Sequence, residues 1–315
     1  MTLSVAQSVG VDISKDTLDV HLHPVGRGRR FTNDRRGCAA LIAWLQDFTI
    51  ARIAFEPTGA YHHTFERRLA AAGLPLVKVN PRQARRFAEA IGQHAKTDPI
   101  DAALLARFAA LLEPPVRPVV SATLDTMKEL HIARRALVKD RIAALNREST
   151  RRSALLKRQA RERLRQIDRQ IAAIDVALRV ELSTDPALEA RFDILKSIPG
   201  IGAATALAIL IEMPELGTLD PRCAASLAGL APIARDSGQY RGKRFIRGGR
   251  AQLRQALYMP ALVAVRFNAE LKAKYEALRA AGKPPKLALT AIMRKLLILA
   301  NALLRDGRTW APQRA

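Results

Sequence analysis

Val9-Gly-Val-Asp12 and Leu18-Asp-Val-His-Leu22 decide the fold class of this chain. Both runs combine apolar and β-branched residues over a few positions, and they predict two paired strands. A third strand is expected near Phe31. Ile53-Ala-Phe-Glu56 and Leu76-Val-Lys-Val79 are apolar runs that predict two further, buried strands. The first eighty residues therefore predict a β-sheet.

Helical patterns separate these strands. Gly37 to Phe48 and Ala60 to Ala72 carry apolar residues at the spacing of a helix. The order is then strand, strand, strand, helix, strand, helix, strand, which predicts an α/β mixed-sheet domain. Pro81 to Leu112 predicts two more helices, the second of which starts at Asp98-Pro99. Pro114-Pro115 closes this domain.

A long segment without helix breakers follows. No Gly or Pro lies between Pro118 and Pro186, which predicts a helical hairpin or coiled coil. The charged stretch Arg147 to Arg165 forms its tip or an exposed face, and a solvated surface and a nucleic-acid contact are equally good interpretations of it. The heptad-like apolar positions of one helix are Leu164, Ile167, Ile171, Ile174 and Leu178, and those of the opposing helix are Met127, Leu130, Leu137 and Leu145.

The remainder of the chain is expected to be mostly helical, with one irregular Gly-rich insert between Leu227 and Gly249. The predicted organisation is an α/β domain over 1–115, a helical coiled-coil or dimerisation segment over 116–190, and a C-terminal domain over 191–315.

The charge of the chain points to a polyanionic partner. Its 52 Lys and Arg residues outnumber its 29 Asp and Glu residues, which gives a net charge of +23 over 315 residues. Such an excess argues against an enzyme of small neutral metabolites. The basic residues are spread along the chain rather than gathered in one amphipathic anchor, which favours nucleic acid over a membrane surface.

Cysteine usage and hydropathy point to a cytoplasmic protein. Cys38 and Cys223 are too few and too far apart for a disulfide framework or a clustered zinc site. The apolar stretch Leu287 to Leu304 is interrupted by Arg294 and Lys295, so we expect a packed helix rather than a membrane span.

Four carboxylates have the pattern of a two-metal site. Asp12 and Glu56 come at the ends of two predicted strands, and Asp98 and Asp101 share the first turn of a predicted helix. Phosphodiester chemistry with two Mg²⁺ ions about 3.5–4 Å apart needs such oxygen ligands. The rarity of acids in this basic chain, and their place where sheets bind ligands, favour metal binding by all four together.

Each acid has a structural alternative. Asp98 before Pro99 is typical of a helix N-cap, and Asp101 would then be a first-turn acid that favours the helix dipole. The two strand-end acids are also common in turns. Lys15 and Lys96 are neighbours whose charges would lower the carboxylate pKa values.

Ile198-Pro-Gly-Ile-Gly202 has the pattern of a helix-hairpin-helix motif. Gly200 and Gly202 would let main-chain N–H groups approach a phosphate at a helix N-terminus, whatever the base sequence. A plain turn between two helices is the alternative.

Ser237 lies in a basic loop. A serine hydroxyl becomes a nucleophile only when it is oriented and the charge that develops on phosphorus is neutralised, which arginines do well. A serine beside Gly238 is more often a turn residue, and Gly238 and Gly242 can equally shape a phosphate-binding loop. The surrounding side chains are those of Arg235, Tyr240, Arg241, Lys243, Arg244 and Arg247.

Taken together, these segments resemble the DEDD-type transposases of insertion sequences, over nearly the whole chain. These are bridge-RNA-guided serine recombinases with a RuvC-like N-terminal domain of RNase H-like fold and a C-terminal transposase domain. The segments that carry the resemblance are Val9-Gly-Val-Asp-Ile-Ser-Lys15, Phe55-Glu-Pro-Thr-Gly-Ala-Tyr61, Lys96-Thr-Asp-Pro-Ile-Asp-Ala102, Ile198-Pro-Gly-Ile-Gly202 and Asp236-Ser-Gly-Gln-Tyr-Arg-Gly242.

The resemblance implies roles for particular residues. Asp12, Glu56, Asp98 and Asp101 would occupy the DEDD positions and bind Mg²⁺ or Mn²⁺, and Ser237 would be the serine that links covalently to DNA. The two domains would join in composite active sites from different protomers, with the coiled coil assembling dimers into a tetramer. A structured RNA from the element would pair with donor and target DNA, so that sequence choice lies in the RNA.

Two other functions fit parts of the pattern. A metal-dependent Holliday-junction endonuclease would use the acids without the serine. A non-catalytic DNA- or RNA-binding architectural protein would use the acids as helix caps and the arginines as phosphate contacts, with salt-sensitive binding that needs no Mg²⁺.

Overall fold

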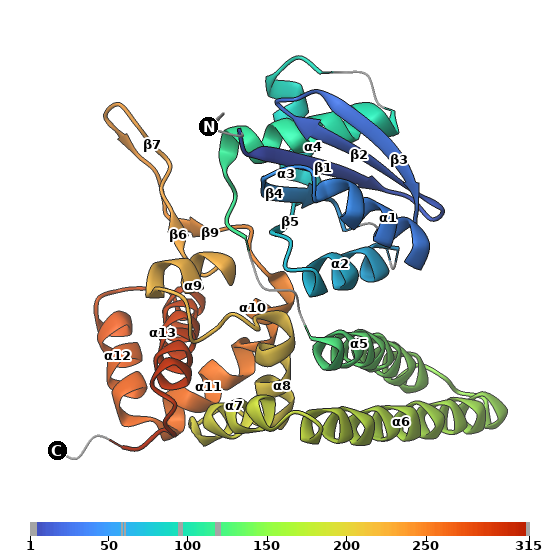
Figure 1. The fold of residues 1–315 in the computed structure, drawn as a ribbon. Coiled ribbons are helices and arrows are strands. Elements are labelled where there is room, and N and C mark those ends of the chain that lie inside the picture. The colour runs from blue at the N-terminus through green and yellow to red at the C-terminus, as the bar shows by residue number, and fades with distance from the viewer. Residues whose placement is uncertain (1–4, 58, 60, 94–96, 117–120, 313–315) are drawn as a thin grey trace. The chain divides into compact units, whose positions relative to one another are not determined.

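The chain divides into two compact units, Met1–Val119 and Val120–Ala315 (Figure 1). The structure is a computed structural model that describes residues 5–57, 59, 61–93, 97–116 and 121–312. Each unit is described by itself.

The first unit is built on a five-stranded mixed sheet of order β3-β2-β1-β4-β5. Its strands are β1 (Gln7–Ile13), β2 (Thr17–His23), β3 (Arg27–Thr32), β4 (Ile50–Phe55) and β5 (Leu76–Lys78). β1 pairs antiparallel with β2 and β2 with β3, whereas β4 runs parallel to β1 and to β5. The predicted mixed α/β sheet is confirmed.

Helices cover both faces of this sheet. They are α1 (Arg35–Leu45), α2 (His62–Ala71), α3 (Pro81–Ala90) and α4 (Asp98–Leu112). Val9, Val11 and Phe55 pack with residues of α1 and α2, whereas Ala54 and Val77 pack with residues of α3 and α4. This alternation follows from strand geometry, since successive side chains point to opposite faces. The result is a three-layer unit.

Gly10 explains how closely α4 approaches the sheet. A Cβ atom at this position of β1 would lie 2.0 Å from the main-chain oxygen of Ala102 and 2.3 Å from the main-chain nitrogen of Ala106. Only glycine admits a helix backbone at this distance. The Val9-Gly-Val motif therefore holds the first turns of α4 directly against β1.

The second unit begins with the predicted helical hairpin, formed by α5 (Ala122–Ser149) and α6 (Ala154–Ser183). Met127 of α5 and Leu178 of α6 are fully buried. Ion pairs that join the helices confirm the antiparallel arrangement, because residues further along α5 pair with residues earlier in α6. These pairs are Arg134–Asp175 at 2.5 Å, Arg141–Asp168 at 2.6 Å and Glu148–Arg161 at 3.3 Å.

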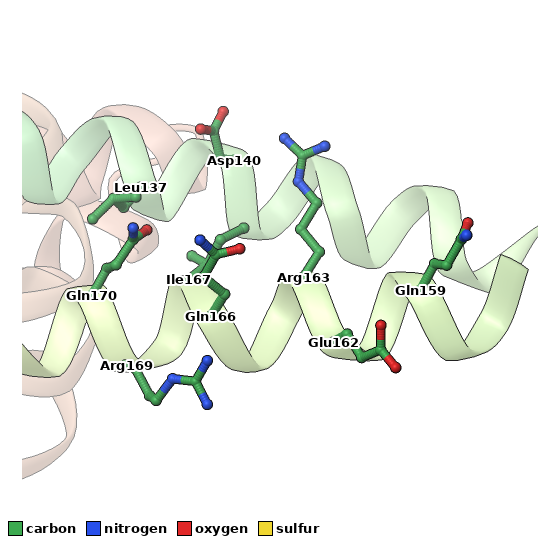
Figure 2. Close-up of a pocket in the computed structure, with 9 residues that line it drawn as sticks. All are labelled: Leu137, Asp140, Gln159, Glu162, Arg163, Gln166, Ile167, Arg169 and Gln170. Carbon is green, nitrogen blue, oxygen red and sulfur yellow. The ribbon is translucent and has the colours of Figure 1, made fainter.

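Towards its tip the hairpin opens into a polar hollow of about 630 Å³ (Figure 2). Leu137 and Ile167 are the two apolar side chains in its lining, and the other lining side chains are charged or amides. Both of these apolar residues are predicted heptad positions, and Ile167 is buried. The polar lining residues are Asp140, Gln159, Glu162, Arg163, Gln166, Arg169 and Gln170.

A helical cluster completes the unit. Its helices are α7 (Pro186–Ser197), α8 (Ala203–Glu212), α9 (Pro221–Leu227), α10 (Ala251–Ala256), α11 (Tyr258–Phe267), α12 (Ala269–Ala280) and α13 (Pro285–Asp306). Among the described helices, α13 alone is long and apolar enough to cross a membrane, with a mean hydropathy of 1.8. It packs as a core helix, because buried Asn301 accepts from the N–H of Gly217 and donates to the carbonyl of Leu219, each at 2.7 Å.

The insert predicted to be irregular contains a short two-stranded ribbon, which the sequence analysis did not predict. β6 (Pro232–Ile233) pairs with β9 (Phe245–Ile246), and beyond them β7 (Asp236–Ser237) pairs with β8 (Tyr240–Arg241). Each strand has only two residues, too few for an alternation to show in the sequence. The ribbon projects from the helical cluster (Figure 1).

Candidate functional site

Two of the predicted acids lie side by side at the carboxyl ends of parallel strands. Val11 of β1 is paired with Phe55 of β4 in a parallel register. Asp12 and Glu56 are the next residues of these two strands, so they lie at the same edge of the sheet. Asp12 is the penultimate residue of β1, and Glu56 follows the last residue of β4.

The other two acids come from the first turn of α4, which Gly10 holds against β1. Thr97, rather than Asp98, is the N-cap residue, and its side chain makes no capping hydrogen bond. The alternative interpretation of Asp98 as an N-cap is therefore wrong, because Asp98 is the first helical residue. Its side chain is 55% exposed.

Electrostatics connect these four acids. The pKa of Asp12 is raised to about 6, first by burial and then by the charges of Asp98, Asp101, Asp19 and Glu56 in decreasing order. Coulombic effects of this kind require proximity. The structure thus brings the predicted acids together around Asp12. The lowering expected from nearby lysines is wrong for Asp12, since no lysine is among the causes, and Lys96 lies outside the described residues.

Asp19 is a fifth carboxylate that the sequence analysis missed. It faces Asp12 across the β1–β2 pair and Arg30 across the β2–β3 pair. Its side chain is only 8% exposed and accepts a hydrogen bond of 2.8 Å from Nε of Arg30, whose Nη2 lies 3.8 Å from Asp98. The available signal in the sequence was that Asp19 is an acid placed between two core residues of a strand, Leu18 and Val20.

The donor chemistry at this edge fits a hard divalent cation. The cluster offers carboxylate oxygens. Burial is the largest cause of the raised pKa of Asp12, and repulsion by the neighbouring negative charges adds to it. Mg²⁺ and Mn²⁺ take oxygen ligands and would relieve this repulsion.

A second group of potential metal ligands lies on α2. One ligand atom from each of His62, His63 and Glu66 lies within 4.8 Å of the others. However, Nζ of Lys78 is 2.7 Å from Oε1 of Glu66, and the two imidazoles are stacked with centroids 4.3 Å apart. The planes of the two imidazoles are inclined by 30°. We interpret this group as a buried ion pair that anchors α2 to β5, with burial lowering the pKa of His62.

The glycines of the helix-hairpin-helix motif have different surroundings. Gly200 has φ +98°, and a Cβ there would lie 2.6 Å from the main-chain oxygen of Pro260. Gly202 is the N-cap of α8, with φ −84°, and a Cβ at this position would meet no atom within 4 Å. Gly200 is therefore required for packing against α11, and Gly202 leaves the helix N-terminus open. Phosphate binding by either glycine stays a prediction.

Gly200→Ala is expected to destabilise the protein by about 2–4 kcal/mol, because left-handed strain and a backbone clash add. Gly202→Ala, whose φ suits alanine, should stay within about 1 kcal/mol of wild type. Thermal or urea unfolding of both full-length variants measures the difference. Equal stabilities would contradict the assigned packing role.

Ser237 lies at the outer end of the ribbon. It is paired with Tyr240 across a turn that begins at Gly238, where φ is +53°. The main-chain oxygen of Arg235 would be 2.3 Å from a Cβ at Gly242, so this glycine allows the two arms to approach. Ser237 is thus the last residue of β7, directly before the turn, and a phosphate-binding role of the two glycines stays a prediction.

Two of the basic side chains of the ribbon already contact other residues of the ribbon. Arg244 donates to Asp236 at 2.8 Å, and the Arg235 guanidinium lies 5.0 Å from the centre of the Phe245 ring. Arg241, Lys243 and Arg247 are exposed. Among the described residues, the Ser237 hydroxyl makes no hydrogen bond, and thus has no proton acceptor beside it in its own unit.

Sequence comparisons identify the family. A DEDD transposase family of the IS110 type matches residues 9–159, and the family described as "Transposase IS116/IS110/IS902 family" matches residues 192–276. The pilin gene-inverting protein of Moraxella lacunata is 30% identical to this chain, over 95% of the chain and 96% of its own length. The chain belongs to the IS110 family of DEDD transposases. It is thereby a DNA-recombining enzyme of the transposase class, and its family implies the use of a divalent metal.

Other IS110-type relatives match part of the chain. A 43.6 kDa protein of insertion element IS110 from Streptomyces coelicolor is 36% identical over 36% of this chain and 29% of its own length. A 42 kDa protein of insertion element IS900 from Mycobacterium paratuberculosis is 35% identical over 44% of this chain and 37% of its own. Of the two family matches, the first contains all four predicted acids and the second contains Ser237.

Proposed function

We propose that this IS110-family transposase is a Mg²⁺-dependent, RNA-guided recombinase that moves its own insertion element through a serine-linked DNA intermediate. The observation that carries the metal-dependent part is the convergence of Asp98, Asp101 and Glu56 on Asp12. Burial first, and then the charges of the neighbouring carboxylates, raise the pKa of Asp12 to about 6. Isolated helix caps or turn residues would not repel one another in this way.

Asp12, Glu56, Asp98 and Asp101 are the residues that would hold Mg²⁺. When bound, the metal would polarise a phosphodiester and neutralise charge that develops on its oxygens. With the metal bound, these carboxylates would present a cation rather than bare negative charge to the DNA backbone. Their position at the carboxyl ends of parallel strands is where open α/β sheets usually bind ligands.

Ser237 is the nucleophile in this proposal. Its Oγ forms a bond to phosphorus while one P–O bond of the DNA backbone breaks, and the released strand end takes up a proton as an alcohol. The serine proton passes to an acceptor that arrives with the DNA-bound assembly. The number of phosphoester bonds is conserved, so attack by another strand end on the phosphoserine rejoins DNA and frees the serine without an added energy source.

The basic ribbon supports this role of Ser237 electrostatically. Exposed guanidinium and ammonium groups beside the serine would bind the attacked phosphate and stabilise its additional charge. Gly202 would position a second phosphate at the N-terminus of α8. Gly200 would contribute by shaping the motif. The ribbon residues with the proposed phosphate role are Arg235, Arg241, Lys243, Arg244 and Arg247.

Guidance by an element-encoded RNA accounts for the size of the positive charge. Donor DNA, target DNA and a structured RNA all require counter-charge, and the chain carries +23. We assign the catalytic carboxylates to 1–115, assembly of dimers into a tetramer to 116–190, and the serine chemistry to 191–315. The Moraxella relative is called a pilin gene-inverting protein, and inversion, like insertion, exchanges strands between two sites. The protein would act in the cytoplasm, on DNA.

Asp98→Asn separates the proposed function from its alternatives. Purified protein, RNA transcribed from the flanking noncoding DNA, donor and target duplexes and Mg²⁺ should yield recombined DNA with wild type and at least about a hundredfold less with Asp98→Asn. Asn preserves the shape of Asp but loses its charge. Full activity of this variant would remove Asp98 from the proposed metal site, and no strand breakage even with wild type would favour an architectural protein. Cleaved Holliday junctions with free ends, and no joined product, would favour the metal-only endonuclease.

A further inference from the structure

Asn33 ties together two loops of the first unit. It lies between β3 and α1, and its Nδ2 donates to the carbonyl of Ser14 at 2.7 Å and to that of Tyr61 at 3.0 Å. Its main-chain N–H also donates to the carbonyl of Asp16 at 2.9 Å. One short side chain thus bridges the turn after β1 and the segment after β4. An amide nitrogen carries two N–H donors, which this bridge requires.

These two loops lead away from the proposed metal ligands. Ser14 follows Asp12 by two residues, and Tyr61 follows Glu56 by five. The β1–β4 ladder has its last pair at Val11 and Phe55, so beyond it the strands no longer hold each other. Within the described residues, no main-chain hydrogen bond joins the two loops past this pair.

Helix capping does not explain the Asn33 side chain. The N-cap of α1 is Asp34, whose carboxylate accepts from the N–H of Gly37 at 2.7 Å. The amide of Asn33 points instead to the carbonyls of Ser14 and Tyr61. The bridge therefore acts on the loops rather than on the start of the helix.

We infer that Asn33 is a positioning residue, which fixes the spacing of Asp12 and Glu56 by bridging the loops that follow them. The inference rests on the proposed metal site. Carboxylates that gather without a cation repel one another, and a bridge behind them opposes their separation. Groups that hydrogen-bond metal ligands directly contribute roughly 10- to 100-fold to metal affinity, and Asn33, which acts through the loops, should contribute less.

Asn33→Leu tests this inference, because leucine matches asparagine in size and removes both donors. We expect the Mg²⁺ concentration at the midpoint of Mg²⁺-induced thermal stabilisation, measured on the full chain without DNA, to rise by up to about 10-fold. Asn33→Ser is a second, milder variant with a single donor, and it should also raise the midpoint. The Mg²⁺ midpoint of either variant is measured without any recombination assay.

Asn80→Leu is the matched control. Asn80 accepts a capping hydrogen bond of 2.9 Å from the N–H of Arg82 at the start of α3, in the same unit. Its loss should lower the melting temperature and leave the Mg²⁺ midpoint unchanged. Wild-type midpoints in Asn33→Leu and Asn33→Ser would overturn the positioning role while the metal site stands. A wild-type protein that does not respond to Mg²⁺ would overturn the metal site, and the inference with it.

Discussion

Ser237→Ala is expected to form no denaturation-resistant protein–DNA adduct and to lose strand exchange by at least about a thousandfold. Removal of an attacking oxygen leaves only binding and charge stabilisation, and no bond can form to phosphorus. Labelled donor and target duplexes, the element RNA and Mg²⁺ supply the assay. Denaturing gels then separate protein-linked from free DNA.

Gln239→Ala is the matched control for this change, because Gln239 lies in the same ribbon turn and is exposed. It should keep most of the adduct, and both variants should bind DNA with similar salt dependence, since neither changes the charge of the ribbon. Free cut ends in wild type and Ser237→Ala alike would assign cleavage to the carboxylates alone.

Asp12→Asn has opposite expected effects on activity and on stability. Strand exchange should fall by at least about a thousandfold, because a central carboxylate of the proposed Mg²⁺ site is lost. Without metal, the variant should be more stable than wild type at neutral pH. The pKa of Asp12 is about 6 in the folded chain against an ordinary value of 3.8, so the folded state disfavours the charged form.

The pH dependence follows from the direction of this shift. A carboxyl whose pKa is raised by folding makes its largest contribution to the free energy of unfolding below about pH 4. This contribution falls as the pH rises towards 6 and is constant above that pH. A shift of about two units corresponds to about 3 kcal/mol, which solvent screening of a partly exposed group reduces to about 1–2 kcal/mol. Asp12→Asn should lack this fall in metal-free thermal unfolding from pH 4 to 7.5.

Mg²⁺ should reverse the order of stability, because it stabilises ionised Asp12 in wild type and finds one ligand fewer in the variant. Asp16→Asn is the control, since exposed Asp16 is not among the charges that raise the pKa of Asp12. Identical pH profiles for wild type and Asp12→Asn would contradict the electrostatic coupling of the cluster.

Much of the sheet was predictable because its strands are apolar. Runs such as Val9-Gly-Val and Ile53-Ala-Phe lie in the core, where hydrophobicity marks the strand directly. β3 lacks such an apolar run, because Arg27 to Arg30 are exposed and only Phe31 is buried. The predicted acids could be proposed from their places at strand ends and on one helical turn.

Asp19 could not be predicted from the same patterns. Its link to the cluster depends on two registers at once, since it faces Asp12 on one side and Arg30 on the other. Register is fixed by the turns and by the hydrophobic pattern of both partners, and β3 supplies little of that pattern. Nor does local sequence reveal the bridge of Asn33, whose acceptors are 19 and 28 positions away.

The ribbon has a consequence for when the protein can react. Its ladder consists of four residue pairs, and the side chains of β6, β7 and β8 are exposed. An isolated hairpin of this kind is marginally stable in water, so its opening should cost little free energy and its amides should exchange rapidly. In the proposed mechanism, the serine would thus be carried on an element that nucleic acid stabilises. A lone protein molecule would then hold its nucleophile without a fixed position, which would protect the host chromosome from cleavage.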